Sequence, residues 1–96
     1  MNEFFAALGK RWSEAARARG AKIDDPTLEA DVAEEILELA RVVSHAKERR
    51  FAPLATFTAG VAAERLRASK GRLDPGAVAA YVREVREAVE REAAPR

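Results

Sequence analysis

Hydrophobic residues recur at three- and four-residue intervals along four segments of the chain, with polar residues between them. This spacing places the hydrophobic side chains on one face of an α-helix. It predicts helices over residues 2–19, from 26 to 46 or 48, over 53–70 and over 75–92. No segment alternates in the way that a half-buried β-strand does. The pattern therefore predicts an all-α fold, namely a four-helix bundle.

The third predicted helix differs from the others because its first three turns have no charged face. Small uncharged residues, Gly60 among them, fill the positions between its larger apolar side chains, which are Leu54, Phe57, Val61 and Leu66. A helix that is apolar or small on every side is typically buried on every side. We therefore expect the third helix to be the central element of the bundle, with close packing at Gly60.

Residues that favour helix ends stand at the predicted boundaries. The signals for a helix start are Asn2, Asp25 with Pro26, Pro53, and Asp74 with Pro75, and the signals for a helix end are Gly20 and Gly71. Residues 21–25 are expected to form a turn. Gly9, inside the first helix, either weakens the prediction of that helix or marks a point of close packing.

Length and composition narrow the range of functions. A chain of 96 residues with 48% hydrophobic and 34% charged side chains predicts one globular domain over residues 1–96. The absence of cysteine excludes a disulfide scaffold, a thiolate zinc site and a thiol nucleophile, and one histidine leaves few imidazole-based sites. We expect a protein that is not an enzyme and that holds no metal.

The net charge of +1 conceals a strong segregation of charge along the chain. Residues 23–40 carry seven acidic and no basic side chains, whereas residues 41–72 carry eight basic and two acidic ones. Such an acidic block argues against a nucleic-acid-binding protein. The chain also lacks a signal-peptide pattern and any apolar run of the roughly 20 residues that span a bilayer. We therefore expect a soluble, cytoplasmic protein that binds neither membrane nor nucleic acid.

Basic side chains gather where the second predicted helix ends and the third begins. Arg41, His45 and Arg49 are spaced at i, i+4 and i+8, which aligns them along one side of the helix, and Arg50 follows. The backbone N–H groups of Leu54, Ala55 and Thr56 would be free if the third helix begins at Pro53, and such groups attract anions. These seven residues form the predicted ligand site, which is suited to a phosphate or a pyrophosphate. In the alternative interpretation, the same side chains only stabilise a helix end or pair with carboxylates.

The same corner resembles a small bacterial helical domain of unassigned function. That family typically reads L-A-R-x-x-A-H, then a short turn with arginine, then A-P-L-T-T-F-L-x-G-x-A. The matching positions here are Arg41, His45, Arg49 or Arg50, Pro53, Thr56, Phe57 and Gly60. The chain departs from the family at Ser44, Ala55 and Thr58.

The resemblance implies a setting in molybdenum-cofactor metabolism, because members of that family occur alone or fused to the guanylyltransferase that makes molybdopterin guanine dinucleotide. It implies this setting and a set of positions, and not an activity. The first hypothesis is therefore a non-catalytic accessory module in this setting, with no cofactor of its own. The ligand would be a molybdopterin nucleotide, and the partner would be a molybdenum-cofactor biosynthesis enzyme or a molybdoenzyme.

A second hypothesis is a helical domain for homo-oligomerisation or protein interaction, without a small ligand. Phe4, Phe5 and Trp12 give the first helix more apolar surface than one small core is expected to cover. This surplus favours a homodimer. A small nucleic-acid-binding protein is the third hypothesis, and the acidic block counts against it.

Overall fold

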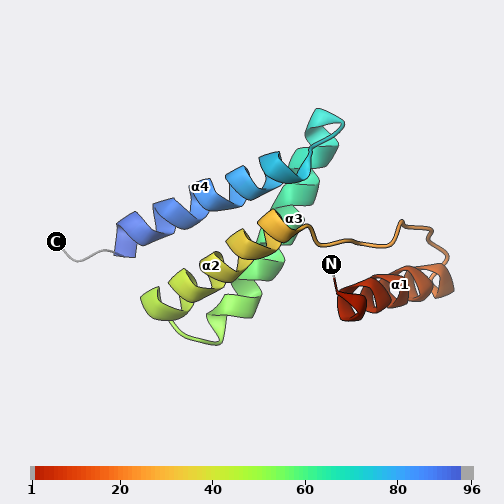
Figure 1. Cartoon of the computed structure of the whole chain (residues 1–96), viewed down its shortest axis with the longest axis horizontal. Coiled ribbons are helices and arrows are strands. Elements are labelled where there is room, and N and C mark those ends of the chain that lie inside the picture. Colours follow the sequence, from red (N-terminus) through yellow and green to blue (C-terminus); the bar gives the residue numbers. More distant parts are fainter. Residues whose placement is uncertain (1, 94–96) are drawn as a thin grey trace. The chain divides into compact units, whose positions relative to one another are not determined.

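A computed structural model of the chain describes residues 2–93 and contains four helices (Figure 1). They are α1 (Glu3–Ala18), α2 (Ala30–Ala46), α3 (Phe51–Lys70) and α4 (Pro75–Ala93). Within residues 2–93 there is no strand, which confirms the predicted all-α class. The chain divides into two compact units, Met1–Ala30 and Asp31–Arg96. The prediction of one domain over residues 1–96 stays a prediction.

The first unit is a helix with a chain segment that returns along it. Asn2 caps α1 as predicted, because its side-chain oxygen accepts a hydrogen bond from the N–H group of Phe5 at 3.1 Å. Gly20 has a φ of 80°, which suits the turn that follows the helix. The return segment then contacts the middle of α1, where a Cβ atom at Gly9 would lie 2.5 Å from the carbonyl oxygen of Pro26. Of the two interpretations of Gly9, the structure therefore supports close packing.

The second helix begins four residues later than its sequence signals predict. Asp25 and Pro26 are not its cap and first residue, because α2 begins at Ala30. Pro26 and Leu28 instead line a small cleft of about 120 Å³ together with residues of α1, among them Trp12. Contacts made by the return segment within the first unit outweigh the local preference for a helix start.

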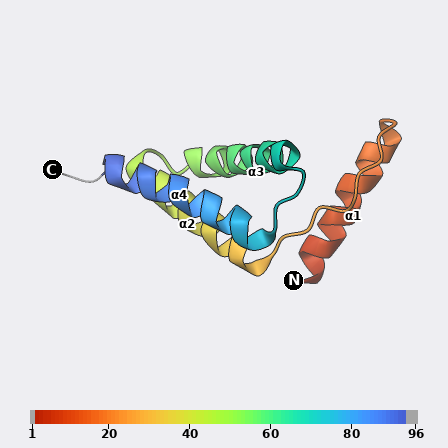
Figure 2. The same ribbon diagram turned by 90° about the horizontal axis from the view of Figure 1, so that it is seen from above.

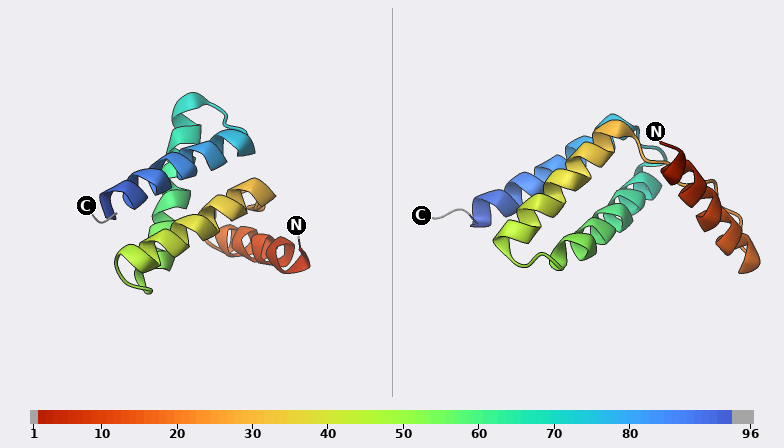
Figure 3. Two further views of the ribbon diagram at one scale, coloured as in Figure 1. Left: turned by 60° about the vertical axis from the view of Figure 1, so that its left-hand side comes forward. Right: turned by 60° about the horizontal axis from the view of Figure 1, so that its bottom comes forward.

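In the second unit, α2 and α4 form one layer and α3 crosses them as the other. Figures 1 and 3 show α2 and α4 side by side and running in the same direction, and Figure 2 shows α3 on the other side. Two ion pairs agree with this parallel arrangement. Glu35 of α2 pairs with Arg86 of α4, and Arg41, further along α2, lies 4.0 Å from Glu90 of α4.

The core of the second unit is small. Its buried apolar residues are Leu39, Val42, Ala52, Ala79 and Val82. In α3, which the structure describes in full, Ala52 alone is buried. Leu54 and Phe57 are 63% and 72% exposed, and a Cβ atom at Gly60 would have no neighbour within 4 Å. The expectations of full burial for α3 and of close packing at Gly60 are thus wrong within this unit.

The ends of α3 and α4 follow the sequence closely, apart from one boundary. Gly71 has a φ of 85° at the end of α3, and Asp74 caps α4 by accepting a hydrogen bond from the N–H group of Ala77 at 2.8 Å. The exception is the start of α3, which lies at Phe51 and makes Pro53 the third residue of the helix. None of the helices within residues 2–93 is long and apolar enough to span a lipid bilayer.

Candidate functional site

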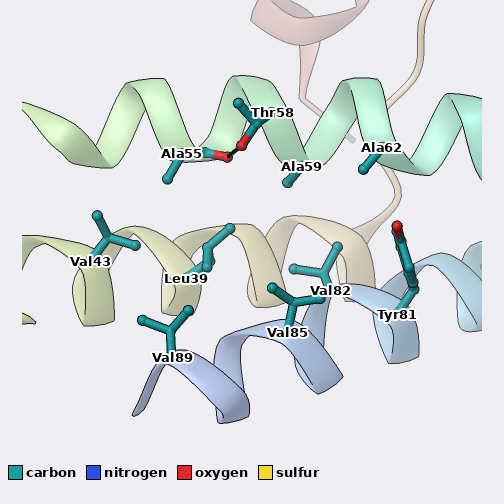
Figure 4. A pocket seen from close by; sticks show the side chains of 10 residues that line it. All are labelled: Leu39, Val43, Ala55, Thr58, Ala59, Ala62, Tyr81, Val82, Val85 and Val89. Carbon is teal, nitrogen blue, oxygen red and sulfur yellow. Dashed lines mark hydrogen bonds between the residues drawn. The ribbon is translucent and has the colours of Figure 1, made fainter. Parts of the chain in front are cut away.

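An apolar groove opens between the two layers of the second unit, with a volume of about 310 Å³. Figure 4 shows Ala55, Ala59 and Ala62 of α3 pointing toward α2 and α4 across it. The larger side chains come from the opposite layer and are Leu39, Val43, Tyr81, Val82, Val85 and Val89. Because alanine is small, these side chains leave space between the layers instead of closing it.

The groove offers few polar groups. The hydroxyl of Thr58 donates a hydrogen bond to the carbonyl of Ala55 in its own helix, at 2.7 Å. The remaining polar side-chain group of the lining is the phenol of Tyr81. No carboxylate, imidazole or amine lines the groove. Such a surface is suited to apolar contact and not to acid–base chemistry.

Two further clefts lie beside α3 and also include Thr58. One has a volume of about 560 Å³ and is lined by Phe57, Val61, Leu66 and Tyr81 among others. The other has a volume of about 320 Å³ and is lined by Val43, Phe51, Leu54, Ala55 and Thr58. The apolar surface around α3 is therefore continuous, and not a set of isolated exposed side chains.

The contact between α2 and α4 contains a cluster of paired charges, in which Arg86 Nε is buried without a hydrogen-bond partner among residues 2–93. The side chain of Glu35 is 10% exposed, and its carboxylate accepts hydrogen bonds from Arg83 Nε at 2.8 Å and from Arg86 Nη2 at 3.2 Å. The hydrogen bond from Arg83 lowers the pKa of Glu35 and outweighs burial, which raises it. Arg86 also donates to Glu90 at 2.9 Å. This cluster fixes the register of α2 against α4.

The structure brings together two of the predicted ligand residues. Arg41 and His45 line a shallow cleft of about 220 Å³ whose other residues include Glu90 of α4. Arg41 already donates two hydrogen bonds to Glu38, at 3.1 and 2.9 Å. Two carboxylates therefore lie near this guanidinium, so the local charge is less positive than the sequence suggests.

The other predicted ligand residues do not join this cleft. Arg50 donates a hydrogen bond to Glu48 at 2.9 Å, and its side chain is 81% exposed. Arg49 forms no ion pair with any residue in the part of the chain that the structure describes. Neither arginine lines the cleft that contains Arg41 and His45.

The backbone part of the predicted anion site is not available, because α3 begins at Phe51 and not at Pro53. The N–H groups of Phe51 and Ala52 donate to the carbonyls of Glu48 and Arg49, at 3.0 and 3.2 Å, and Pro53 has no N–H group. The N–H groups of residues 54–56 lie inside the helix, where they bond to carbonyls four residues earlier. The hydroxyl of Thr56 donates to the carbonyl of Pro53 at 3.0 Å.

Sequence reasoning missed the exposed apolar surface of α3. Its signal was present, because residues 51–63 carry no charge on any side of the helix. On its own, that pattern predicts burial within the chain. The same pattern is equally compatible with burial against a partner.

The fold and this surface define a class of protein, a small all-α domain with an apolar groove between two helical layers. The chain belongs to the family described as Domain of unknown function (DUF6457), which matches residues 6–96. The match includes most of α1, so both units belong to the family domain. Comparisons with curated proteins and with solved structures gave no match.

Proposed function

We propose that this protein is a non-catalytic helical module that binds another protein, and that the apolar surface of α3 is its binding surface. The observation that carries the proposal is the exposure of Leu54 and Phe57, at 63% and 72%, where each lines a cleft beside α3. Large apolar side chains that adjoin clefts typically mark protein interfaces. The fitting partner presents an apolar helical surface, because helices and the clefts between them accept the apolar side chains of a facing helix.

Photo-cross-linking tests this function directly. The full chain would carry the photoreactive residue p-benzoylphenylalanine in place of Phe57, and a control chain would carry it in place of Glu87, which is exposed on α4. After irradiation in the producing cells, mass spectrometry would identify the cross-linked peptide. We expect a discrete protein adduct at position 57, joined through an apolar helical segment, and little at position 87. Equal or absent adducts at both positions would contradict the proposal.

A second candidate function is binding of an anionic ligand at the cleft of Arg41 and His45. The shared cleft of about 220 Å³ favours it, since a guanidinium and an imidazole face the same space there. The resemblance noted in the sequence makes a molybdopterin nucleotide the ligand and a molybdenum-cofactor enzyme the partner. Glu38 and Glu90 near Arg41 count against a strongly basic site.

Nuclear magnetic resonance distinguishes this second candidate from the first. Pyrophosphate would be titrated into the full chain while the His45 ring signals are followed. For an anion site, the signals shift, the shift weakens with added salt, and Arg41→Ala abolishes it. Arg49→Ala is the matched control, because Arg49 lies outside the cleft. Unchanged His45 signals would remove the anion-binding candidate and leave the protein-binding proposal untouched.

A further inference from the structure

We propose that the partner bound by α3 is a second copy of this chain, in an antiparallel contact between the two α3 helices that is centred on Phe57. This inference rests on the proposed function and names the partner for the same surface. Three observations support it. They are the spacing of the exposed residues of α3, the position of the charged residues along that face, and the clefts on both sides of it.

The exposed face of α3 has the spacing of a helix-pairing seam. Its residues follow one another at intervals of four and three and are Arg50, Leu54, Phe57, Val61, Glu64 and Ala68. All of them are exposed except Val61, which is half-buried. Alternating intervals of three and four keep a row of side chains facing a partner helix along its length. The seam is apolar in its middle and charged at its ends.

The position of charge favours a copy of the same helix, in the antiparallel direction. Phe57 is the midpoint of the uncharged run from Phe51 to Ala63. An antiparallel contact centred there overlaps the two uncharged runs completely, so no charge is buried between them. A parallel contact would instead place each charged end beside the same charges of the other copy.

The first seam charges beyond the uncharged run are complementary in this register, whereas Arg49 faces Arg65 beside the seam. Positions equally distant from Phe57 face each other, so Glu64 faces Arg50 of the second copy. Glu64 and Arg50 both belong to the exposed seam. The two-fold symmetry repeats this facing pair once more in the dimer. A two-fold contact of this kind closes on itself and yields a dimer instead of a longer assembly.

The clefts explain why a second copy suits this surface better than a single foreign helix. Clefts of about 560 and 320 Å³ adjoin the seam through Phe57 and Leu54, and their linings are mainly apolar, with Arg65 at the larger one. One amphipathic helix presents one apolar stripe and covers one such cleft. A second copy presents its own Leu54 and Phe57 together with the surfaces beside them, so that both sides of the seam are covered.

The first test measures whether the chain forms a dimer and whether a substitution in the seam weakens that dimer. We expect light scattering on the full chain to show a dimer at tens of micromolar, and Leu54→Glu to weaken the dimer at least about tenfold. Because Leu54 is 63% exposed, the variant should keep the circular dichroism and melting curve of the monomer. A wild-type chain that stays monomeric at several hundred micromolar overturns the inference, and so does a dimer that Leu54→Glu leaves intact.

The absence of cysteine allows a sharp test of the register. Phe57→Cys places one thiol from each copy at the two-fold axis, so mild oxidation should give a covalent dimer rapidly. Glu87→Cys is the control, because Glu87 is exposed on α4 outside the seam. This variant should form much less covalent dimer. Equal rates of covalent dimer formation in the two variants overturn the antiparallel contact.

A charge exchange tests the direction of the two helices. Arg50→Glu should weaken the dimer, because the new carboxylate faces Glu64 of the second copy. Adding Glu64→Arg to this variant should restore the dimer. Failure of the double variant to recover overturns this register. A photo-cross-link from position 57 to a different protein would retain the proposed function while overturning self-association. An absence of any adduct would remove both.

Discussion

Gly9 lies in the middle of α1 at a position without room for a side chain. A Cβ atom there would lie 2.5 Å from the carbonyl oxygen of Pro26, which belongs to the backbone of the return segment. That segment has to move before a methyl group can fit. We expect Gly9→Ala to lower the free energy of unfolding of the first unit by about 1–3 kcal/mol, although alanine favours helix. Urea unfolding followed by circular dichroism measures the change.

Gly60 is the matched control, since it also lies inside a helix but has no neighbour within 4 Å of an added Cβ. We expect Gly60→Ala to raise the free energy of unfolding by about 0.5–1 kcal/mol, because alanine loses less backbone entropy in a helix. The measurement uses dilute protein, so that association does not contribute. A loss of stability at Gly60, or none at Gly9, would show that these local environments are different from those described.

Glu35 is a nearly buried carboxylate between two arginines, and it makes stability depend on pH. The hydrogen bond from Arg83 lowers the pKa of Glu35 in the folded chain below its ordinary value of 4.5. The folded state therefore binds this proton less tightly than the unfolded state does. The stabilisation is present above the ordinary pKa and is lost as the pH falls through the lowered value.

We expect the melting temperature to fall as the pH falls through the lowered pKa of Glu35. The variant Glu35→Gln should show a weaker dependence of the melting temperature on pH. At neutral pH the variant should be less stable, because the amide removes the carboxylate that Arg83 binds and leaves Arg86 with Glu90 alone. Melting curves from neutral to acidic pH, for wild type and variant, provide the measurement. Parallel pH profiles for the two proteins would exclude Glu35 as a source of the dependence.

At the scale of elements, Asp74 determines where α4 begins. Its side chain accepts a hydrogen bond from the N–H group of Ala77 at 2.8 Å, which satisfies one of the free donors of the first turn. We expect Asp74→Ala to lower the free energy of unfolding by about 0.5–2 kcal/mol, whereas Asp74→Asn should remain close to wild type. Urea unfolding of both variants tests this. A large loss with asparagine would mean that the charge matters more than the cap.

The start of α2 shows where local signals fail. Asp25 and Pro26 form a favourable cap and first residue, but Pro26 instead contacts α1 at Gly9. No local pattern could reveal this, because the contact joins residues that are 17 positions apart. The prediction of the start of α3 is wrong for a related reason. Proline is tolerated throughout the first helical turn, so Pro53 marked the turn correctly but not its first residue.

At the scale of the whole molecule, the first unit is too small to be independently stable. It contains one helix of 16 residues, and its Phe4 and Trp12 side chains are 66% and 56% exposed. Isolated helices of this length are marginal in water, and chains below about 40 residues rarely fold without a staple. We expect a peptide of residues 1–30 to be mostly unfolded by circular dichroism. A cooperative melting transition in the peptide would show that the unit folds alone.

The predicted ligand site shows the limit of spacing as evidence. The i, i+4 spacing of Arg41 and His45 depends on one helix alone. In the structure both side chains line the same cleft, as this spacing predicts. The carboxylates that face Arg41 could be foreseen only in part. Glu38 lies one turn away on the same helix, whereas Glu90 lies on α4 and is brought near only by the pairing of α2 with α4.

The sequence by itself determined the helical class, the caps at Asn2 and Asp74 and the turns at Gly20 and Gly71. Each of these depends on residues within a few positions of one another, where hydrogen bonding and backbone preference act locally. Tertiary structure alone decided that the return segment contacts α1, that Glu35 pairs with Arg83 and that α3 leaves Leu54 and Phe57 exposed. Hydrophobic periodicity identifies the face that must be covered, but it carries no information about what covers it, because burial is non-directional and depends only on the area removed from water.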